Sequence, residues 1–321
     1  MPEKTRNILT EAVTSGDRRS IFHRYGDRPS YSGKEKFIRW LLASMGHLTV
    51  MVTVSIILVL LVDALFFFEK ASFIEFFTGT KWEPFGQPKK LGVLPLFSGT
   101  MMIAFGSCMV AIPFGFGSAV YLTQYASPRF QALVKPVIEV LGGVPTVVYG
   151  YFALTGITPL LKVVFPEIQV FNALSASIVV GISIIPMVSS LSSDAMNAVP
   201  NSIKTAGYAV GMQKFHVVTK IIIPASTSGV IASFMLAFAR AVGETMTVTL
   251  AAGSTPNMSW NYLEGIQTMT AFIVQMSLGD TPAGSIEYYT IYAIGLSLFG
   301  VTFLFNFIAT TIVKRFREVY K

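Results

Sequence analysis

Long apolar runs separated by short polar segments dominate this chain. A bilayer core needs about 20 apolar residues per helix, so each long run predicts a membrane-spanning helix. The runs lie roughly at 43–67, 98–123, 135–161, 172–192, 222–251 and 288–313. The pattern therefore predicts an all-α integral membrane protein with about six transmembrane helices.

Two segments depart from a simple row of spans. The fifth run, 222–251, is too long for one straight crossing, so we expect it to tilt, to begin outside the lipid or to break near Gly243. The weakly apolar segment at about 265–278 is too short to cross, which favours an interfacial or re-entrant helix.

Composition and charge placement support this interpretation. The 321 residues are 52% hydrophobic and 13% charged, whereas soluble domains are about a quarter charged. Lys and Arg gather in the first tail, the 2–3 loop, the 4–5 loop and the last tail, while 252–287 contains none. Since Lys and Arg accumulate on the cytoplasmic side, we expect both termini in the cytoplasm. Residues 1–39 are predicted to be a polar tail and 40–321 a permease domain.

Several kinds of chemistry are missing from the sequence. No Gly-x-x-x-x-Gly-Lys-Ser/Thr loop occurs, so we expect no ATP hydrolysis by this chain. Cys108 is the single cysteine, and His23, His47 and His216 have no metal-ligand spacing. We expect no metal, no cofactor, no catalytic residue and no nucleic-acid partner. Active transport would then need energy from a partner protein or an ion gradient.

The cytoplasmic segment 193–224 has a helix–glycine–helix pattern. Gly211 permits the positive φ that ends a helix, and Pro224 begins the helix that enters the membrane. This segment is an ordinary loop or a docking element for a cytoplasmic motor. It resembles the "EAA" loop of ABC importer permeases, which implies that Thr205, Ala206, Gly207, Gly211 and Pro224 contact an ATPase. Thr205 stands at the usually acidic position, and Gly207 replaces the second alanine.

The third run contains Gly142, Gly143 and Pro145, a combination that predicts a broken or kinked helix. Backbone groups freed by a break are tolerated in a membrane only against protein or a water-filled path. A closely packed glycine face is the alternative. The run Glu139–Gly150 resembles the phosphate permease signature Glu-x-Leu-x-Gly-x-Pro-Ser-Val-Val-Tyr-Gly, with Thr146 in place of serine.

The fifth run contains two charges that are costly in a bilayer. Arg240 and Glu244 are four residues apart, so we expect them to share a helix face, on which they can pair. The pair either holds helices together or provides a cation that lines an anion path. Arg-x-x-Gly-Glu-Thr-Met resembles the PstC-type phosphate permease family, as do Trp82-Glu83-Pro84 and the stretch 92–100.

The resemblance covers roughly residues 40–315 and implies an ABC importer transmembrane domain of the MetI-like kind. It implies phosphate as substrate in the bacterial cytoplasmic (inner) membrane. The implied partners are a second homologous permease, two ATPase subunits and an extracytoplasmic phosphate-binding protein. The implied path residues are Arg240, Glu244, Glu139, Thr146, Tyr149 and Thr245.

Three other functions are compatible with the residues. A permease for another oxyanion, such as sulfate or molybdate, needs much the same lining. An ion-coupled carrier or a passive channel would use the intramembrane charges as its own coupling site, and ATP-dependent uptake that is lost without the ATPase would reject it. A signalling role of the basic tail could coexist with transport.

Overall fold

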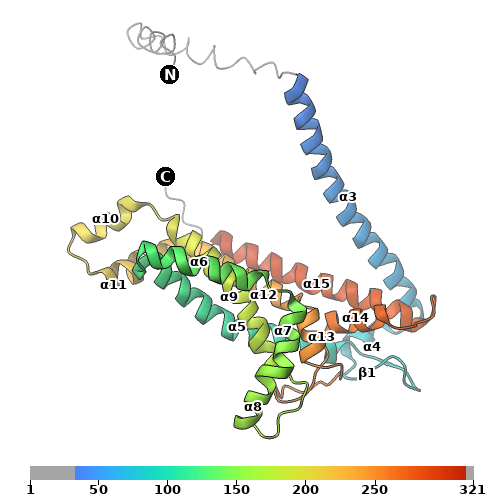
Figure 1. Ribbon diagram of the computed structural model, residues 1–321. Helices are drawn as coiled ribbons and strands as arrows, with labels where there is room; N and C mark the ends of the chain where they lie inside the picture. Colours follow the sequence, from blue (N-terminus) through green and yellow to red (C-terminus); the bar gives the residue numbers. More distant parts are fainter. Residues whose placement is uncertain (1–32, 316–321) are drawn as a thin grey trace. The chain divides into compact units, whose positions relative to one another are not determined.

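The computed structural model describes residues 33–315, and these are largely helical (Figure 1). Within this described range, six helical stretches are long and apolar enough to cross a membrane. Their bounds are Gly33–Lys70, Leu94–Tyr125, Thr146–Val164, Ala173–Asn197, Lys214–Val242 and Ile286–Arg315. The predicted all-α membrane fold with about six spans is confirmed.

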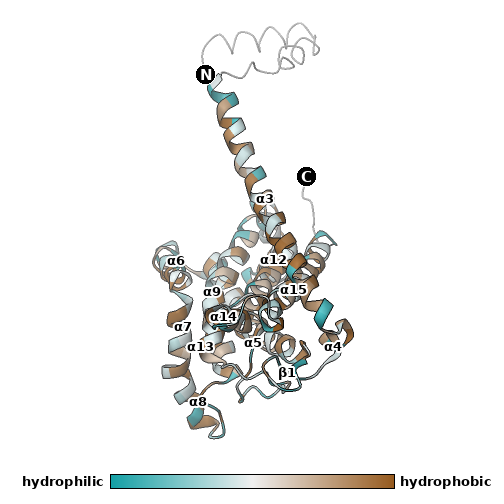
Figure 2. Ribbon diagram, turned by 90° about the vertical axis from the view of Figure 1, so that its right-hand side faces the viewer, coloured by the Kyte–Doolittle hydropathy of each residue, from teal (hydrophilic) through white to brown (hydrophobic). Residues whose placement is uncertain are grey.

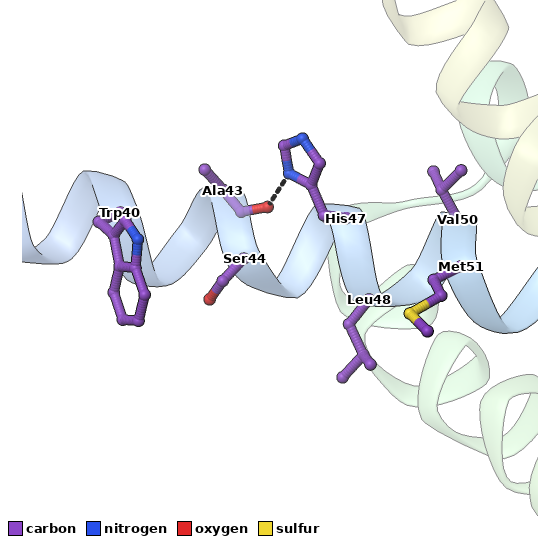
Figure 3. A pocket seen from close by; sticks show the side chains of 8 residues that line it. Trp40, Ala43, Ser44, His47, Leu48, Val50 and Met51 are labelled. Carbon is purple, nitrogen blue, oxygen red and sulfur yellow. Dashed lines mark hydrogen bonds between the residues drawn. The ribbon is translucent and has the colours of Figure 1, made fainter.

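The chain divides into two units, Met1–Ile57 and Leu58–Lys321. The described part of the first unit is the beginning of α3 (Gly33–Lys70). Its side chains are almost all exposed and mostly apolar, as suits a lipid-facing helix. Figure 3 shows one face of it, on which the His47 ring donates to the Ala43 carbonyl at 2.7 Å. The predicted tail 1–39 loses residues 33–39 to this helix, and residues 1–32 lie outside the described range.

The second unit is built around four long helices that pack side by side. They are α5 (Leu94–Val120), α9 (Ala173–Asn197), α12 (Ile223–Val242) and α15 (Ile286–Arg315). Small residues let α5 and α9 approach closely, because a Cβ at Gly181 would lie 2.8 Å from the Ser107 carbonyl oxygen. Figure 2 shows apolar residues along most of these helices.

Two smaller apolar clusters lie at opposite ends of this bundle. One joins the end of α3 to α4 (Phe73–Thr78), the antiparallel strands β1 (Trp82–Glu83) and β2 (Lys90–Leu91), and α14 (Met269–Leu278). The other joins the far ends of α5 and α9 to the start of the fifth span. The expected short helix at 265–278 is confirmed as α14.

Three spans contain a π-helical turn. These turns are η1 (Tyr121–Tyr125), η2 (Ala153–Ile157) and η3 (Val218–Ile222). The third span is composed of α7 (Thr146–Phe152), η2 and α8 (Thr158–Val164). The sequence places this span at 135–161, which is wrong at its start. Residues 135–143 belong to a separate helix, α6 (Pro128–Gly143).

Candidate functional site

The first feature of the site is the break between α6 and α7. α6 continues through both glycines to Gly143, and Val144 is extended with φ −65° and ψ 130°. The residue before a proline is pushed out of the helical region, so Pro145 causes the break. The helix therefore ends where the break was predicted, although the glycines are helical and it is the proline that stops the helix.

The carbonyl groups freed at the end of α6 are partly satisfied within the chain. The Tyr149 hydroxyl, on α7, donates to the Leu141 carbonyl at 2.7 Å. The Val144 amide donates to the same oxygen at 3.4 Å. Tyr149 is buried, so its hydroxyl is committed to bridging the break.

The second feature is a break in the fifth run. α12 ends at Val242, Gly243 caps it, and α13 (Met246–Ala251) follows. Glu244 lies in the break and is only 8% exposed. Its carboxylate accepts a hydrogen bond from the Thr247 amide at 3.3 Å, which caps the start of α13. The expected break near Gly243 is confirmed.

The expected pairing of Arg240 with Glu244 on one helix face is wrong. The helix stops between the two residues, so the four-residue spacing no longer places them on the same face. Lys89 pairs with Glu287 and Lys90 with Glu83, whereas within residues 33–315 Arg240 forms no ion pair with Glu244 or Glu139. Arg240 and Glu139 are exposed in this chain.

The two breaks lie against each other because α7 packs on α13. The Thr247 hydroxyl donates to the Thr146 carbonyl at 3.0 Å, at the first residue of α7. A Cβ at Gly150 would lie 2.9 Å from Leu250 Cβ, so this glycine permits the close approach. The structure thus brings Glu244, Thr146 and Tyr149 into one region, and Arg240 lies in the last turn of α12, which leads into it.

The remaining predicted site residues are Thr245, in the second break, and the three residues predicted to break the third helix. Thr245 is half-buried, and its hydroxyl donates to the Gly243 carbonyl at 3.1 Å. Gly142, Gly143 and Pro145 are exposed. A Cβ at Gly143 would meet nothing within 4 Å, and one at Gly142 would meet Pro186 at 3.5 Å. Among residues 33–315, these two glycines do not form the close-packed face that was the alternative.

Sequence reasoning missed three residues of this region. Gly150, Thr247 and Thr270 each make a contact between elements that are far apart in sequence, and the Thr270 hydroxyl donates to the Glu244 carbonyl at 2.8 Å. Gly150 closes the Glu139–Gly150 motif, which was the available signal. A threonine in an apolar helix gives no such signal, because it commonly bonds to its own helix.

The segment 193–224 has the predicted helix–glycine–helix form. α10 (Asn201–Ala209) ends in a Schellman turn, with the Gly211 amide donating to the Tyr208 carbonyl and Met212 to Gly207. Gly211 has φ +81°, as predicted. α11 (Lys214–Val217), η3 and α12 follow, with Pro224 in the first turn of α12.

The four other residues of this motif divide between surface and interior. Thr205, Ala206 and Pro224 are exposed, as a docking surface would require. Gly207 is buried, and a Cβ there would lie 2.6 Å from Ile221 Cδ1. The alanine of the importer pattern would therefore require the end of the Ile221 side chain to shift. Figure 1 shows α10 and α11 at one end of the bundle.

Six spans, paired helix breaks and a helical hairpin at one end together define a multi-pass membrane permease. Known proteins agree. Residues 111–318 match the family model "Binding-protein-dependent transport system inner membrane component", so the chain belongs to this family of ABC transporter permeases.

Relatives support the same assignment. The Bacillus subtilis "Probable ABC transporter permease protein YqgH" is 32% identical over 72% of this chain and 75% of its own. "Phosphate transport system permease protein PstC" of Xylella fastidiosa is 30% identical over 75% of this chain and 79% of its own. The protein of the same name from Mesorhizobium japonicum is 28% identical over 75% of this chain and 78% of its own.

Solved structures agree with the fold. A chain of a bacterial ABC transporter for import of the polysaccharide alginate aligns with a TM-score of 0.62 at 13% identity, over 89% of this chain and 99% of that one. A chain of the inward-facing MetNI methionine ABC transporter aligns with a TM-score of 0.53 at 15% identity, over 71% of this chain and 95% of that one. The predicted MetI-like importer fold is thereby confirmed.

Proposed function

We propose that this chain is the channel-forming permease subunit of an ATP-driven importer that carries inorganic phosphate inward across the bacterial cytoplasmic membrane. The proposal rests mainly on the position and exposure of Arg240. It is an exposed guanidinium with no ion pair within the described residues, at the end of a helix that breaks beside a second broken helix. The phosphate permeases among the relatives support the choice of substrate.

The chemistry of the substrate fits this arrangement. Phosphate that crosses the membrane interior loses much of its hydration and needs hydrogen-bond donors in return. A guanidinium offers a planar fork of N–H groups that matches two phosphate oxygens. Glu139 and Thr146, at the neighbouring break, complete the polar lining. Glu244 acts from within the protein, by capping α13 next to the path.

The energy for transport comes from separate ATPase subunits in this proposal. The sequence has no phosphate-binding loop of its own. The segment 193–224, with Thr205 and Ala206 on its exposed surface, docks on the ATPase. It lies on the Lys- and Arg-rich side, which is cytoplasmic together with both termini. A second homologous permease completes the path, and a phosphate-binding protein delivers substrate from outside.

Copurification combined with uptake tests the proposal. Tagged chain extracted in mild detergent is expected to bring an ATPase and a second permease with it. The complex in proteoliposomes, supplied with ATP and the binding protein, is expected to take up labelled phosphate. An excess of unlabelled phosphate should compete, whereas sulfate and molybdate should not. Uptake of sulfate or molybdate in preference to phosphate would contradict the substrate, and uptake without the ATPase would contradict the mechanism.

A further inference from the structure

Thr247 is hydrogen-bonded to both helix breaks. Its amide donates to the Glu244 carboxylate at 3.3 Å, inside the break between α12 and α13. Its hydroxyl donates to the Thr146 carbonyl at 3.0 Å, at the break between α6 and α7. The residue is fully buried. Most other threonine hydroxyls in these helices donate to a carbonyl three or four residues earlier in the same helix, as that of Thr249 does at 2.7 Å.

The bonds of Thr247 belong to a longer chain of contacts. On one side, Tyr149 links α7 to the end of α6 through the Leu141 carbonyl. On the other, the Thr270 hydroxyl of α14 donates to the Glu244 carbonyl at 2.8 Å. These hydrogen bonds run from α6 to α14. Both bonds to Glu244 are buried, and the other two are part-buried. A bond that is shielded from water constrains its partners more than a surface bond does.

We propose that Thr247 is a positioning residue that fixes the two helix breaks to each other, so that they move as one body during transport. The hydroxyl sets where α7 begins, and the amide sets where Glu244 lies. This inference rests on the proposed function, because it assigns Thr247 to the geometry of the same path. Thr247 itself does not touch the substrate.

Removal of the hydroxyl alone tests this role. Thr247→Val keeps the shape of the side chain and the amide, and loses only the donor to Thr146. We expect the maximal rate of phosphate uptake by the complete complex to fall about tenfold, which corresponds to one lost hydrogen bond of ~1.4 kcal/mol. The phosphate concentration at half-maximal rate should stay unchanged. Thr247→Ser, which retains the hydroxyl, should restore the rate. Thr249→Val is the matched control and should transport normally.

A second measurement separates coupled motion from general weakening. Gly143→Cys in a Cys108→Ala background carries one thiol at the exposed end of α6, so its labelling rate reports the state of the first break. In the complex this rate should differ with and without bound ATP. Thr247→Val should reduce that difference. Thr247→Val with wild-type uptake and labelling would overturn the proposal, as would a Ser variant as impaired as Val.

The test still decides the role of Thr247 if Thr247→Val does not reach the membrane, or if the complex does not transport phosphate. If Thr247→Val does not reach the membrane, Thr247→Ala replaces it, since the smaller side chain removes any packing conflict and still lacks the hydroxyl. Wild-type uptake in Thr247→Ala would overturn the proposal. Absence of phosphate uptake by the unaltered complex would contradict the proposed substrate instead. The role of Thr247 would then be decided by the cysteine labelling.

Discussion

The two helix breaks differ in how the protein surrounds them. At the break between α6 and α7, none of the 16 residues of α6 is buried, and a Cβ at Gly143 would meet nothing within 4 Å. At the break between α12 and α13, Glu244 is 8% exposed and is held by Thr247 and Thr270. The first break is exposed within this chain, whereas the second is buried and hydrogen-bonded to neighbouring helices.

This difference suggests a division of roles between the breaks. An exposed break in a membrane protein must face another protein or water, because its free backbone groups cannot face lipid. A buried break with its own hydrogen bonds can hold a charged neighbour such as Arg240 in a fixed position. We therefore expect the first break to line the path and the second to support it.

The largest effect is expected from filling the exposed break. Gly143→Leu has room for its side chain within this chain, so folding should be unaffected, whereas a path lined by this face should be blocked. Phosphate uptake should be lost while the thermal unfolding of the purified complex stays the same. Gly117→Leu is the control, because a Cβ at Gly117 also meets nothing within 4 Å and lies in a different helix, α5. Equal uptake by the two variants would show that the first break does not line the path.

A smaller effect, on stability, is expected from crowding the contact between the breaks. In Gly150→Ala the new Cβ would lie 2.9 Å from Leu250 Cβ and 3.2 Å from Thr247 Cα. The Leu250 side chain can shift, but Thr247 Cα is backbone. Overpacking of this kind costs about 1–3 kcal/mol in the free energy of unfolding. Denaturant or thermal unfolding measures it, with Gly143→Ala as a control that should change stability little. Equal stability of the two variants would mean that α7 and α13 are not in close contact.

The smallest effect is expected from removing the buried charge alone. Glu244→Gln keeps a side-chain oxygen that accepts from the Thr247 amide, so stability should change by less than about 1 kcal/mol. Glu244→Leu leaves that amide without an acceptor and should cost about 1–3 kcal/mol. Unfolding of the two variants beside the unaltered protein provides the test. A Gln variant as unstable as the Leu variant would indicate that the charge, and not the cap, holds the second break.

Much of this fold could be predicted from the sequence because its determinants are local. Apolar runs of sufficient length indicate the spans, and Pro145 disfavours helix at the residue before it. Gly211 adopts φ +81°, a backbone conformation that favours glycine. The Arg240–Glu244 pairing failed because four-residue spacing implies a contact only while the helix continues. Burial of Glu244 and its contact with Thr270 are set by α14, which packs on this region from 26 residues along the chain.

The β1–β2 pair was also beyond sequence reasoning. Each strand has two residues, which is too short for an alternation of apolar and polar positions to be detected in the sequence. Trp82 of β1 pairs with Leu91 of β2, and both are buried against the helices around them. The same holds for Gly150 and Thr247, whose contacts depend on how distant helices meet.

The central claim is that the positive charge at Arg240 meets phosphate in the path, and replacing that charge chemically tests it most directly. In a Cys108→Ala background, Arg240→Cys should assemble with its partners and lose phosphate uptake. Modification of the new thiol with an aminoethyl reagent restores a positive charge and should recover part of the uptake. A neutral reagent of similar size should recover none. Uptake by the unmodified cysteine variant, or equal recovery with both reagents, would contradict the account.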